Sequence, residues 1–428
     1  MQLDKDLPAN YNPVAMSNTE TGSKTDLAID EQVDVLLRGT QAVVPAEGLK
    51  AKLQKSAKTG KPLRVKLGLD PTAPDIHLGF AVVLRKLRQF QDLGHTVVII
   101  IGDYTALIGD PSGRSATRPM LSEEEIRQNA ATYIDQLAVI LDRERTEVRF
   151  NSEWLGQLSF ADLVRLTSQM TVAQVLTRED FRNRFDANQP ISLHELLYPL
   201  AQAYDSVAIE ADIEMGGQDQ TFNVLAGRDL QESVGQEPQV ALFMPLLVGT
   251  DGEKKMSKSL GNYVGIAEPP LTQYSKIMSI GDELMTQYFL LCTDVPVDEF
   301  ENLLQTVANP MEAKHRLASE IVQIYHGAQA AAEAGKEWRR VHSERQLPSE
   351  MPDIVVSPDQ MEEGAVGIVA LIRLANFAPS NGEARRLVEQ GGVTLDGEKI
   401  EDPKANVPVT DGAVLKVGKK NYGRLKLG

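Results

Sequence analysis

Apolar and polar positions between residues 63 and 101 follow the order strand, turn, helix, strand. Leu63 to Leu69 is a short apolar run of strand type, and Pro71 and Pro74 then impose a turn. Apolar residues at helical spacing come next, and Gly94 suits the end of that helix. They are Phe80, Val83, Leu84, Leu87 and Phe90. Thr96 to Ile101 is a β-branched run typical of a buried parallel strand, so the pattern predicts a βαβ unit.

Polar residues follow the ends of the predicted strands. The βαβ unit puts His77 and Gly79 at the first turn of its helix, where free N–H groups and the helix dipole suit a polyphosphate. A glycine-rich loop, residues 102–113, follows the second strand. Later strands at 212–215 and 239–249 run into residues 216–220 and 250–259 in the same way. Open α/β sheets bind ligands at this edge.

The remaining pattern divides the chain into five parts. Residues 1–28 are polar and are predicted to form a disordered tail. Residues 29–265 are predicted to form a Rossmann-like α/β domain with a parallel sheet. An all-α domain at 266–345, a proline-containing linker at 346–363 and a small α+β module at 364–428 follow.

Local signals refine two of these parts. Residues 30–53 read as helical in two pieces broken near Pro45. Residues 120–190 read as an insertion of helices, opened by a capping box at 122–125 and holding one short strand near 147–150, and a helix is predicted at 196–205. In the all-α part, a helix is predicted to begin at Pro310 with one apolar face. That face holds Leu317, Ile321, Ile324, Tyr325 and Ala328.

Composition narrows the protein class. The chain has 428 residues, a net charge of −16 and a single cysteine, Cys292, within an apolar run. One cysteine excludes an internal disulfide framework, and its apolar surroundings favour a buried structural thiol. No apolar run reaches membrane-spanning length, and the first residues lack the pattern of a signal peptide. A cytoplasmic protein without a membrane segment is therefore expected.

The pentapeptide Lys255–Ser259, Lys-Met-Ser-Lys-Ser, is the most specific motif. A solvated basic loop is the simpler explanation for such a cluster, and a lone histidine such as His77 is more often structural. The two together, each after a predicted strand, resemble the signatures of the class I aminoacyl-tRNA synthetases. Within that class the resemblance is to the tyrosyl-tRNA synthetase family, and it runs from about residue 30 to the C-terminus.

The resemblance implies an ATP site that needs no enzyme nucleophile. A tyrosine carboxylate attacks the α-phosphate of ATP, pyrophosphate leaves, and the adenylate passes to the terminal ribose of tRNA(Tyr). Lys255, Lys258, Thr72 and His77 are the implied catalytic groups, because such a reaction requires positioned cations and hydrogen-bond donors. The implied ATP-binding residues are Asp70, His77, Gly79, Lys255, Met256, Ser257, Lys258 and Ser259. No protein metal site is implied, and Mg²⁺ is expected to share the phosphate charge.

The resemblance also implies an amino-acid pocket. Tyr198, Gln202 and Asp205 share one helix face, and Asp205 matches the acceptor for the phenol hydroxyl. The other implied tyrosine-binding residues are Lys66, Thr105, Asp110 and Gln220, and the ribose or adenylate residues are Gly217 and Asp219. An ordinary amphipathic helix, with Asp205 as a surface charge, is the alternative explanation. Tryptophan-specific relatives, the alternative enzyme, are expected to lack the Asp205 carboxylate.

Two positions depart from the family pattern. Phe80 stands where the signature has a second histidine, and it cannot donate a hydrogen bond. This leaves open a non-catalytic RNA-binding derivative that does not use ATP. Lys66 stands where many members carry a tyrosine, so hydroxyl recognition is expected to depend mainly on Asp205.

Residues 364–428 resemble an S4 RNA-binding module, notably at 380–387 and 392–397. They hold ten Lys and Arg against seven Asp and Glu, a basic balance that suits RNA in an otherwise acidic chain. A solvated basic tail is the alternative. The predicted RNA-binding residues are Arg385, Arg386, Lys419 and Lys420. The family is homodimeric, and residues 170–176 are the predicted subunit contact.

Overall fold

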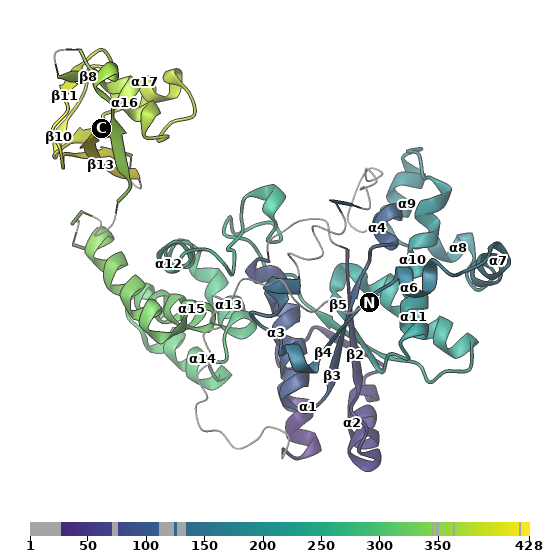
Figure 1. Ribbon diagram of the computed structural model, residues 1–428. Coiled ribbons are helices and arrows are strands. Elements are labelled where there is room, and N and C mark those ends of the chain that lie inside the picture. The colour runs from purple at the N-terminus through teal and green to yellow at the C-terminus, as the bar shows by residue number, and fades with distance from the viewer. Residues whose placement is uncertain are drawn as a thin grey trace. The chain divides into compact units, whose positions relative to one another are not determined.

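The computed structural model describes most of the chain in two units. The described residues are 27–70, 76–110, 124–125, 134–344, 346–347, 351–362, 364–418 and 421–428. The units are Met1–Gly335 and Lys336–Gly428, and Figure 1 shows the elements of both. The predicted disordered tail lies outside the described residues apart from its last two positions, as does most of the helix predicted to open at the capping box of 122–125.

A six-stranded sheet forms the centre of the first unit, in the order β1-β6-β5-β2-β3-β4. Its strands are β1 (Ala42–Val44), β2 (Arg64–Leu69), β3 (Thr96–Ile101), β4 (Thr146–Phe150), β5 (Ile213–Gly217) and β6 (Val240–Met244). All neighbours pair in parallel except β1, which runs antiparallel to β6. The chain moves outward from β2 through β3 to β4, then returns to place β5 on the other side of β2. This is the doubly wound topology, with its switch point between β2 and β5.

Helices cover both faces of this sheet, which confirms the predicted α/β class. In Figure 1, α3 (Leu78–Asp92) lies on one side of the strands, with α10 (Tyr198–Ala208) and α11 (Thr221–Ser233) on the other. Burial on both faces explains why β6 is apolar throughout and β3 is apolar after Thr96. The predicted stripe of α3 is buried except for Phe80, which is half-buried at the first turn.

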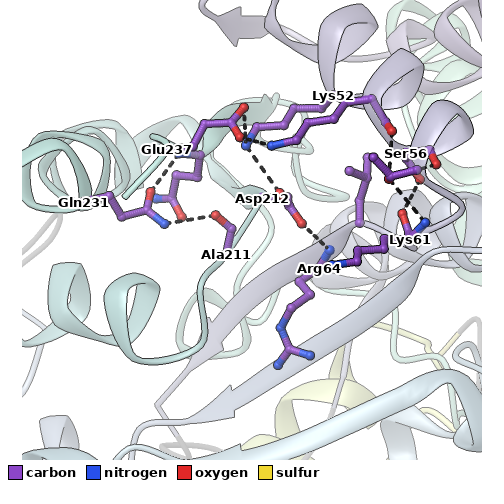
Figure 2. Close-up of polar contacts among 12 residues, drawn as sticks. Lys52, Ser56, Lys61, Arg64, Ala211, Asp212, Gln231 and Glu237 are labelled. Carbon is purple, nitrogen blue, oxygen red and sulfur yellow. Dashed lines mark hydrogen bonds and ion pairs between the residues drawn. The ribbon is translucent and has the colours of Figure 1, made fainter. Parts of the chain in front are cut away.

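The amino ends of β2 and β5 are fixed by a polar network around Asp212 (Figure 2). Its carboxylate accepts from the Lys52 ammonium at 3.3 Å and from the Arg64 backbone N–H at 3.0 Å. Lys52, which is 4% exposed, also pairs with Glu237 at 3.1 Å. Gln231 donates to the Ala211 carbonyl at 3.0 Å. These contacts join α2 (Gly48–Thr59) to the end of the sheet opposite the strand ends that carry the polar loops.

The segment before β2 differs from the helical prediction. It contains α1 (Ile29–Leu37) and α2 (Gly48–Thr59), which are the two predicted pieces, but β1 lies between them. A three-residue segment is too short to show a periodic pattern, and β1 becomes a strand by pairing with β6.

Residues 120–190 are not a purely helical insertion. The strand predicted near 147–150 exists as β4, but it pairs with β3 and forms the edge of the main sheet. Among the described residues between β3 and α10, the other elements with assigned bounds are α4 (Thr105–Ile108), η2 (Arg143–Arg145), α6 (Ser152–Leu155), α7 (Phe160–Thr167), α8 (Val172–Val175), α9 (Glu179–Asp186) and η3 (Leu193–Leu197), where η marks a 3-10 helix. After β5 come η4 (Gln218–Gln220) and, beyond β6, η5 (Lys258–Leu260).

The helical part follows as predicted, with one interruption. It consists of α12 (Pro270–Met278), η6 (Asp282–Leu284), α13 (Met285–Cys292), α14 (Val297–Thr306) and α15 (Pro310–His342). The α15 helix begins at Pro310, but Gly327 adopts φ +86° and kinks it. Within the stripe, Leu317, Ile321 and Tyr325 are buried and Ile324 is half-buried, whereas Ala328 beyond the kink is exposed. Cys292 is 1% exposed, and burial raises the pKa of its thiol to about 12, as expected for a structural cysteine.

The second unit is a small α+β domain with its own core of Ile, Leu, Val and Ala side chains. Its helices are α16 (Ile368–Leu374) and α17 (Asn381–Glu389), with the 3-10 helix η7 (Pro358–Gln360). Its strands are β7 (Asp353–Val356), β8 (Ala365–Gly367), β9 (Val393–Leu395), β10 (Glu398–Lys399), β11 (Asn406–Pro408), β12 (Val414–Val417) and β13 (Asn421–Leu427). The predicted linker 346–363 is wrong at β7, which pairs in parallel with β13. Across the described residues, no helix is long and apolar enough to cross a membrane.

Candidate functional site

Polar side chains gather where β2, β3, β5 and β6 end, around the switch point of the sheet. Asp70 follows β2, Thr105 opens the helix after β3, and Asp219 follows β5. The Lys255–Ser259 loop comes after β6. We distinguish a buried end, formed by Asp70, Thr105, Tyr198, Gln202 and Asp205, from a lysine end, formed by His77, Asp219, Lys255, Met256 and Lys258.

A chain of hydrogen bonds links three predicted residues at the buried end. The Tyr198 hydroxyl donates to Asp70 Oδ2 at 2.9 Å, and the Thr105 hydroxyl donates to Asp70 Oδ1 at 2.9 Å. Burial, followed by the charge of Asp70, raises the pKa of Tyr198 well above its usual value. Gly102 permits this contact, because a Cβ there would lie 2.2 Å from Asp70 Oδ1.

Asp205 is a buried carboxylate rather than a surface charge at a helix end. Asp205 is only 3% exposed, and its carboxylate accepts hydrogen bonds from Trp154 Nε1 at 2.8 Å and from Asn151 Nδ2 at 3.5 Å. Asn151 also donates to Thr105 at 3.1 Å. Burial is the main cause that raises the Asp205 pKa to about 7, and the charge of Lys66 works in the opposite direction.

Lys66 and Gln202 lie at the buried end but turn to protein partners. Lys66 is fully buried, and its ammonium has three acceptors within 3.0 Å. An ammonium has three hydrogens to donate, so the prediction that Lys66 contacts the ligand directly is not supported by this geometry. The Gln202 amide donates to Glu214 at 3.1 Å.

Asp110 and Gln220 meet beside this cluster. Gln220 Nε2 donates to Asp110 Oδ2 at 2.9 Å, and Asn223 donates back to Gln220 Oε1 at 2.9 Å. The Arg178 guanidinium donates a hydrogen bond to Asn223 Oδ1 at 2.8 Å, and it lies 4.0 Å from Asp110 Oδ1. Gly217 is adjacent, and a Cβ there would lie 2.7 Å from Asp219 Oδ1.

His77 is the N-cap of α3, which confirms its predicted place at the helix start. Its Nδ1 accepts from the Phe80 backbone N–H at 3.3 Å, so the proton of the neutral ring lies on Nε2. Burial first, and then the charge of Lys258, lowers the His77 pKa to about 4. The imidazole is therefore neutral near pH 7.

The helix start is not free, contrary to the sequence expectation. The Leu78 N–H donates to the Val264 carbonyl at 2.8 Å, and the Gly79 N–H contacts the Met256 sulfur at 3.3 Å. Met256 is 5% exposed, so the motif loop packs directly on the first turn of α3.

The lysine end is more exposed. Lys255 pairs with Asp219 at 3.1 Å, with side chains 50% and 31% exposed. Ser257 and Ser259 share a hydrogen bond at 2.9 Å. Asn262, which is 4% exposed, closes the loop by accepting from the Ser257 N–H at 2.8 Å and donating to Asp251 at 2.9 Å.

Several predicted residues lie elsewhere, and others were missed. Thr72, Lys419 and Lys420 fall outside the described residues. Arg385 and Arg386 lie exposed on α17, and Arg386 pairs with Glu383 at 2.7 Å. Sequence reasoning missed Asn151, Trp154, Glu214 and Asn262. Only Glu214 carried a signal, as a charge inside an otherwise apolar strand. In the described ranges, no group of three or more His, Cys, Asp or Glu side chains could hold a metal.

Comparison with known proteins places these features in a family. Residues 58–343 match the model of the tRNA synthetases class I (W and Y), and residues 366–412 match the S4 domain. The tyrosine–tRNA ligase of Moorella thermoacetica is 53% identical, over 94% of this chain and 97% of its own. That of Thermotoga maritima is 50% identical, over 93% and 98%.

Solved structures share the fold at low sequence identity. A tyrosyl-tRNA synthetase from Archaeoglobus fulgidus, complexed with L-tyrosine, superposes with a TM-score of 0.55 at 22% identity. The superposition covers 72% of this chain and 100% of the Archaeoglobus fulgidus chain. A C-terminally truncated mitochondrial tyrosyl-tRNA synthetase from Aspergillus nidulans gives 0.59 at 22% identity, over 73% and 94%. At this identity, these two likenesses bear on the fold alone.

Proposed function

The chain belongs to the class I tRNA synthetases of the tryptophan and tyrosine type, and we propose that it is a tyrosine–tRNA ligase. It activates L-tyrosine with ATP and transfers the tyrosyl group to the 3′ end of tRNA(Tyr). Relatives about half identical over nearly the whole chain carry this activity in their names.

The buried carboxylate of Asp205 is the observation that carries the choice of tyrosine. A phenol hydroxyl can donate to it, whereas phenylalanine would leave a buried acceptor without that partner, at a cost of about 1–3 kcal/mol or more. Tryptophan has no hydroxyl at that position, so the tryptophan-specific alternative is disfavoured. Trp154 and Asn151 hold the carboxylate in place by their two hydrogen bonds.

The rest of the buried end holds the amino-acid backbone. In this proposal the ammonium group of tyrosine is bound by Tyr198, Gln202, Asp110 and Thr105, with Gln220 beside the substrate. These groups offer hydroxyl, amide and carboxylate oxygens, which are acceptors for an ammonium donor. The hydrogen bonds from Tyr198 and Thr105 to Asp70 keep the pocket wall in one arrangement.

The lysine end acts on the phosphates. A tyrosine carboxylate oxygen forms a bond to the α-phosphorus, and the bond to the bridging oxygen breaks as pyrophosphate leaves with its electron pair. Lys255 and Lys258 stabilise the charge on the departing group, while neutral His77 donates through Nε2–H. Thr72, Gly79, Met256, Ser257 and Ser259 complete the ATP site, with Asp70, Gly217 and Asp219 towards the nucleoside.

Magnesium accompanies the nucleotide in this proposal. Phosphate oxygens are ligands that Mg²⁺ commonly takes in nucleotide sites, and the ion supplies further charge neutralisation of the triphosphate. The second half-reaction then joins the tyrosyl carbonyl carbon to a ribose hydroxyl of the tRNA, and AMP leaves. We assign tRNA contacts to the S4 domain, with Arg385, Arg386, Lys419 and Lys420 as the basic residues.

The protein is proposed to be a cytoplasmic homodimer. Large apolar side chains are exposed on the segment around the predicted subunit contact, residues 170–176, and a second copy would cover them. They are Phe160 (82% exposed), Val164 (52%), Val172 (60%), Phe185 (61%) and Leu193 (83%). Light scattering after size exclusion is expected to give about twice the 47.0 kDa chain mass. A monomeric mass would contradict the dimer.

Amino-acid-dependent exchange of labelled pyrophosphate into ATP tests the function. Exchange with tyrosine, and none above background with phenylalanine or tryptophan, is the expected result. Exchange with tryptophan would support the alternative enzyme. No exchange with any of them, in folded protein, would favour the RNA-binding derivative that Phe80 leaves open.

A further inference from the structure

Five polar side chains, four of them buried and Gln202 half-buried, form a cluster directly against the proposed amino-acid site. This Glu214 cluster consists of Lys66 on β2, Gln202 and Ser206 on α10, Glu214 on β5 and Gln239 before β6. Lys66, Ser206, Glu214 and Gln239 are fully buried. Charged groups in such surroundings are costly unless every one of them is paired.

Glu214 is fully occupied as an acceptor. Its Oε1 accepts from Lys66 at 3.0 Å and from the Gln202 side chain at 3.1 Å. Its Oε2 accepts from the Ser206 hydroxyl at 3.0 Å and from the Gln239 amide. Two donors therefore reach each oxygen. With donors at both oxygens, the Glu214 carboxylate acts towards all four neighbours only as an acceptor.

Lys66 is fully occupied as a donor. Its ammonium reaches the Gln202 backbone carbonyl at 2.9 Å, the Ser206 hydroxyl at 2.7 Å and Glu214. It neutralises the buried carboxylate and ties it to the backbone of α10. Gly227 on α11 leaves room for the cluster, because a Cβ there would lie 2.6 Å from Gln239 Nε2 and 3.2 Å from Glu214 Oε2.

This arrangement determines which end of the Gln202 amide faces the ligand. An amide has a donating and an accepting end of similar size, and rotation by half a turn exchanges them. Glu214 only accepts, so the NH₂ group of Gln202 must face it, which leaves the carbonyl Oε1 on the other side. Among the described residues, none donates a hydrogen bond to that oxygen.

We propose that Glu214 is a positioning residue, which holds the Gln202 amide with its carbonyl oxygen towards the ammonium group of the bound amino acid. The proposal rests on the proposed function and goes beyond it, since it places the control of ammonium recognition in an ion pair that the ligand does not touch. Lys66 serves this role by pairing with Glu214 and tying it to α10, rather than by contacting the phenol.

The paired change K66M/E214M removes this control without leaving either charge unpaired. A methionine at 214 offers no carboxylate to the Gln202 amide, so that amide can reverse and direct its own NH₂ group at the ligand ammonium. The probes are L-tyrosine, tyramine, which keeps the ammonium without a carboxylate, and 3-(4-hydroxyphenyl)propionate, which keeps the carboxylate without an ammonium. Binding is measured by calorimetry on the full-length protein.

The dissociation constants of tyrosine and tyramine are expected to rise about tenfold or more, as for loss of a charge-assisted hydrogen bond. That of 3-(4-hydroxyphenyl)propionate is expected to change less than about twofold, because it has no group for Gln202 to recognise. The KM for ATP is expected to stay within about threefold. A merely structural role would weaken all three ligands together or none of them, and either result would overturn the proposal.

Two further variants keep the test decisive. Should K66M/E214M fail to fold, K66L/E214L also removes both charges, and the same ammonium-specific loss is expected because buried ion pairs can often be replaced by apolar side chains. R184M/E195M is the matched control, since Glu195 is 2% exposed and pairs with buried Arg184 outside the cluster. It is expected to leave all three affinities unchanged. Wild-type protein that lacks tyrosine-dependent exchange would contradict the proposed function itself, separately from this comparison of variants.

Discussion

The two ends of the candidate site differ in how far their charged groups are buried and in how firmly those groups are paired. At the buried end, Asp205 is 3% exposed and Lys66 and Glu214 are fully buried, and each has protein partners for its charge. At the lysine end, Lys255 pairs with Asp219 while half of its side chain remains exposed. An exposed pair of this kind contributes only about 0–1 kcal/mol, so Lys255 can exchange Asp219 for a phosphate at little cost.

The contrast assigns different tasks to the two ends. Buried, fully paired groups cannot rearrange cheaply, and a ligand that fails to match them leaves an unpaired group behind. Exposed cations on a loop hold no fixed geometry until charge arrives. We therefore expect changes at the buried end to alter which amino acid binds, and changes at the lysine end to alter the rate.

The largest effect is expected from Asp205→Ala. Removing the acceptor leaves the phenol hydroxyl and the Trp154 N–H without their partner, and tyrosine-dependent exchange is expected to fall about 10²–10³-fold in kcat/KM. Discrimination against phenylalanine should fall with it. Pyrophosphate exchange with both amino acids measures this, with circular dichroism as the control for folding. Undiminished discrimination would place tyrosine recognition elsewhere.

Lys255→Ala and Lys258→Ala probe the other end. Each removes a cation from the departing pyrophosphate, so kcat for adenylate formation is expected to fall about 10²-fold. The dissociation constant of tyrosine should change less than about twofold, since neither lysine lies at the buried end. Rapid-quench kinetics and calorimetry separate the two quantities. A large loss of tyrosine affinity would show that the ends are not independent.

The pH dependence of the free energy of unfolding is expected to reveal the cost of burying the Asp205 carboxylate. Its folded pKa is about 7, above the ordinary value of 3.8, so the folded state binds this proton more tightly than the unfolded state. The contribution of this proton to the free energy of unfolding is fully present below about pH 4. It is lost between pH 4 and pH 7 by up to about 1.4 kcal/mol per pH unit. Asp205→Asn has no such proton to lose.

The Asp205→Asn protein is therefore expected to unfold at a higher Tm than the wild type at pH 8, with the difference shrinking towards pH 5. Calorimetric scans of both proteins across that range measure it, and groups titrating in both proteins cancel in the difference. A difference that is constant with pH would contradict the raised pKa.

The smallest effect is expected from Phe80→His, which restores the second signature histidine at the first turn of α3. One added hydrogen-bond donor is expected to raise kcat/KM for ATP about twofold to tenfold. Should the variant exchange pyrophosphate while the wild type does not, Phe80 would be an inactivating residue and the RNA-binding alternative would gain support.

The sequence predicted those elements whose own residues have a period. The βαβ unit, the buried strands and α15 follow from runs of five residues or more. The three-residue strand β1 and the four-residue strand β7 were missed, because such segments become strands only by pairing with β6 and β13. For the same reason β4 was recognised as a strand but not as the edge of the main sheet.

The candidate site was predictable where one segment carries several of its residues. Tyr198, Gln202 and Asp205 share a face of α10, and His77 caps α3. The pairing of Lys66 with Glu214 joins residues 148 positions apart across two neighbouring strands, and no local pattern marks it. The same holds for Trp154 and Asp205, which meet only because β4 lies in the sheet.

Separability of the two ends is tested most directly by tyrosine binding in the absence of ATP. Calorimetry would compare the wild type, Asp205→Ala and the double variant K255A/K258A. The double variant is expected to bind tyrosine within about twofold of the wild type, while Asp205→Ala is expected to bind it about 100-fold more weakly. Equal losses of tyrosine affinity in both variants would contradict the division into a buried end that selects the amino acid and a lysine end that acts on the phosphates.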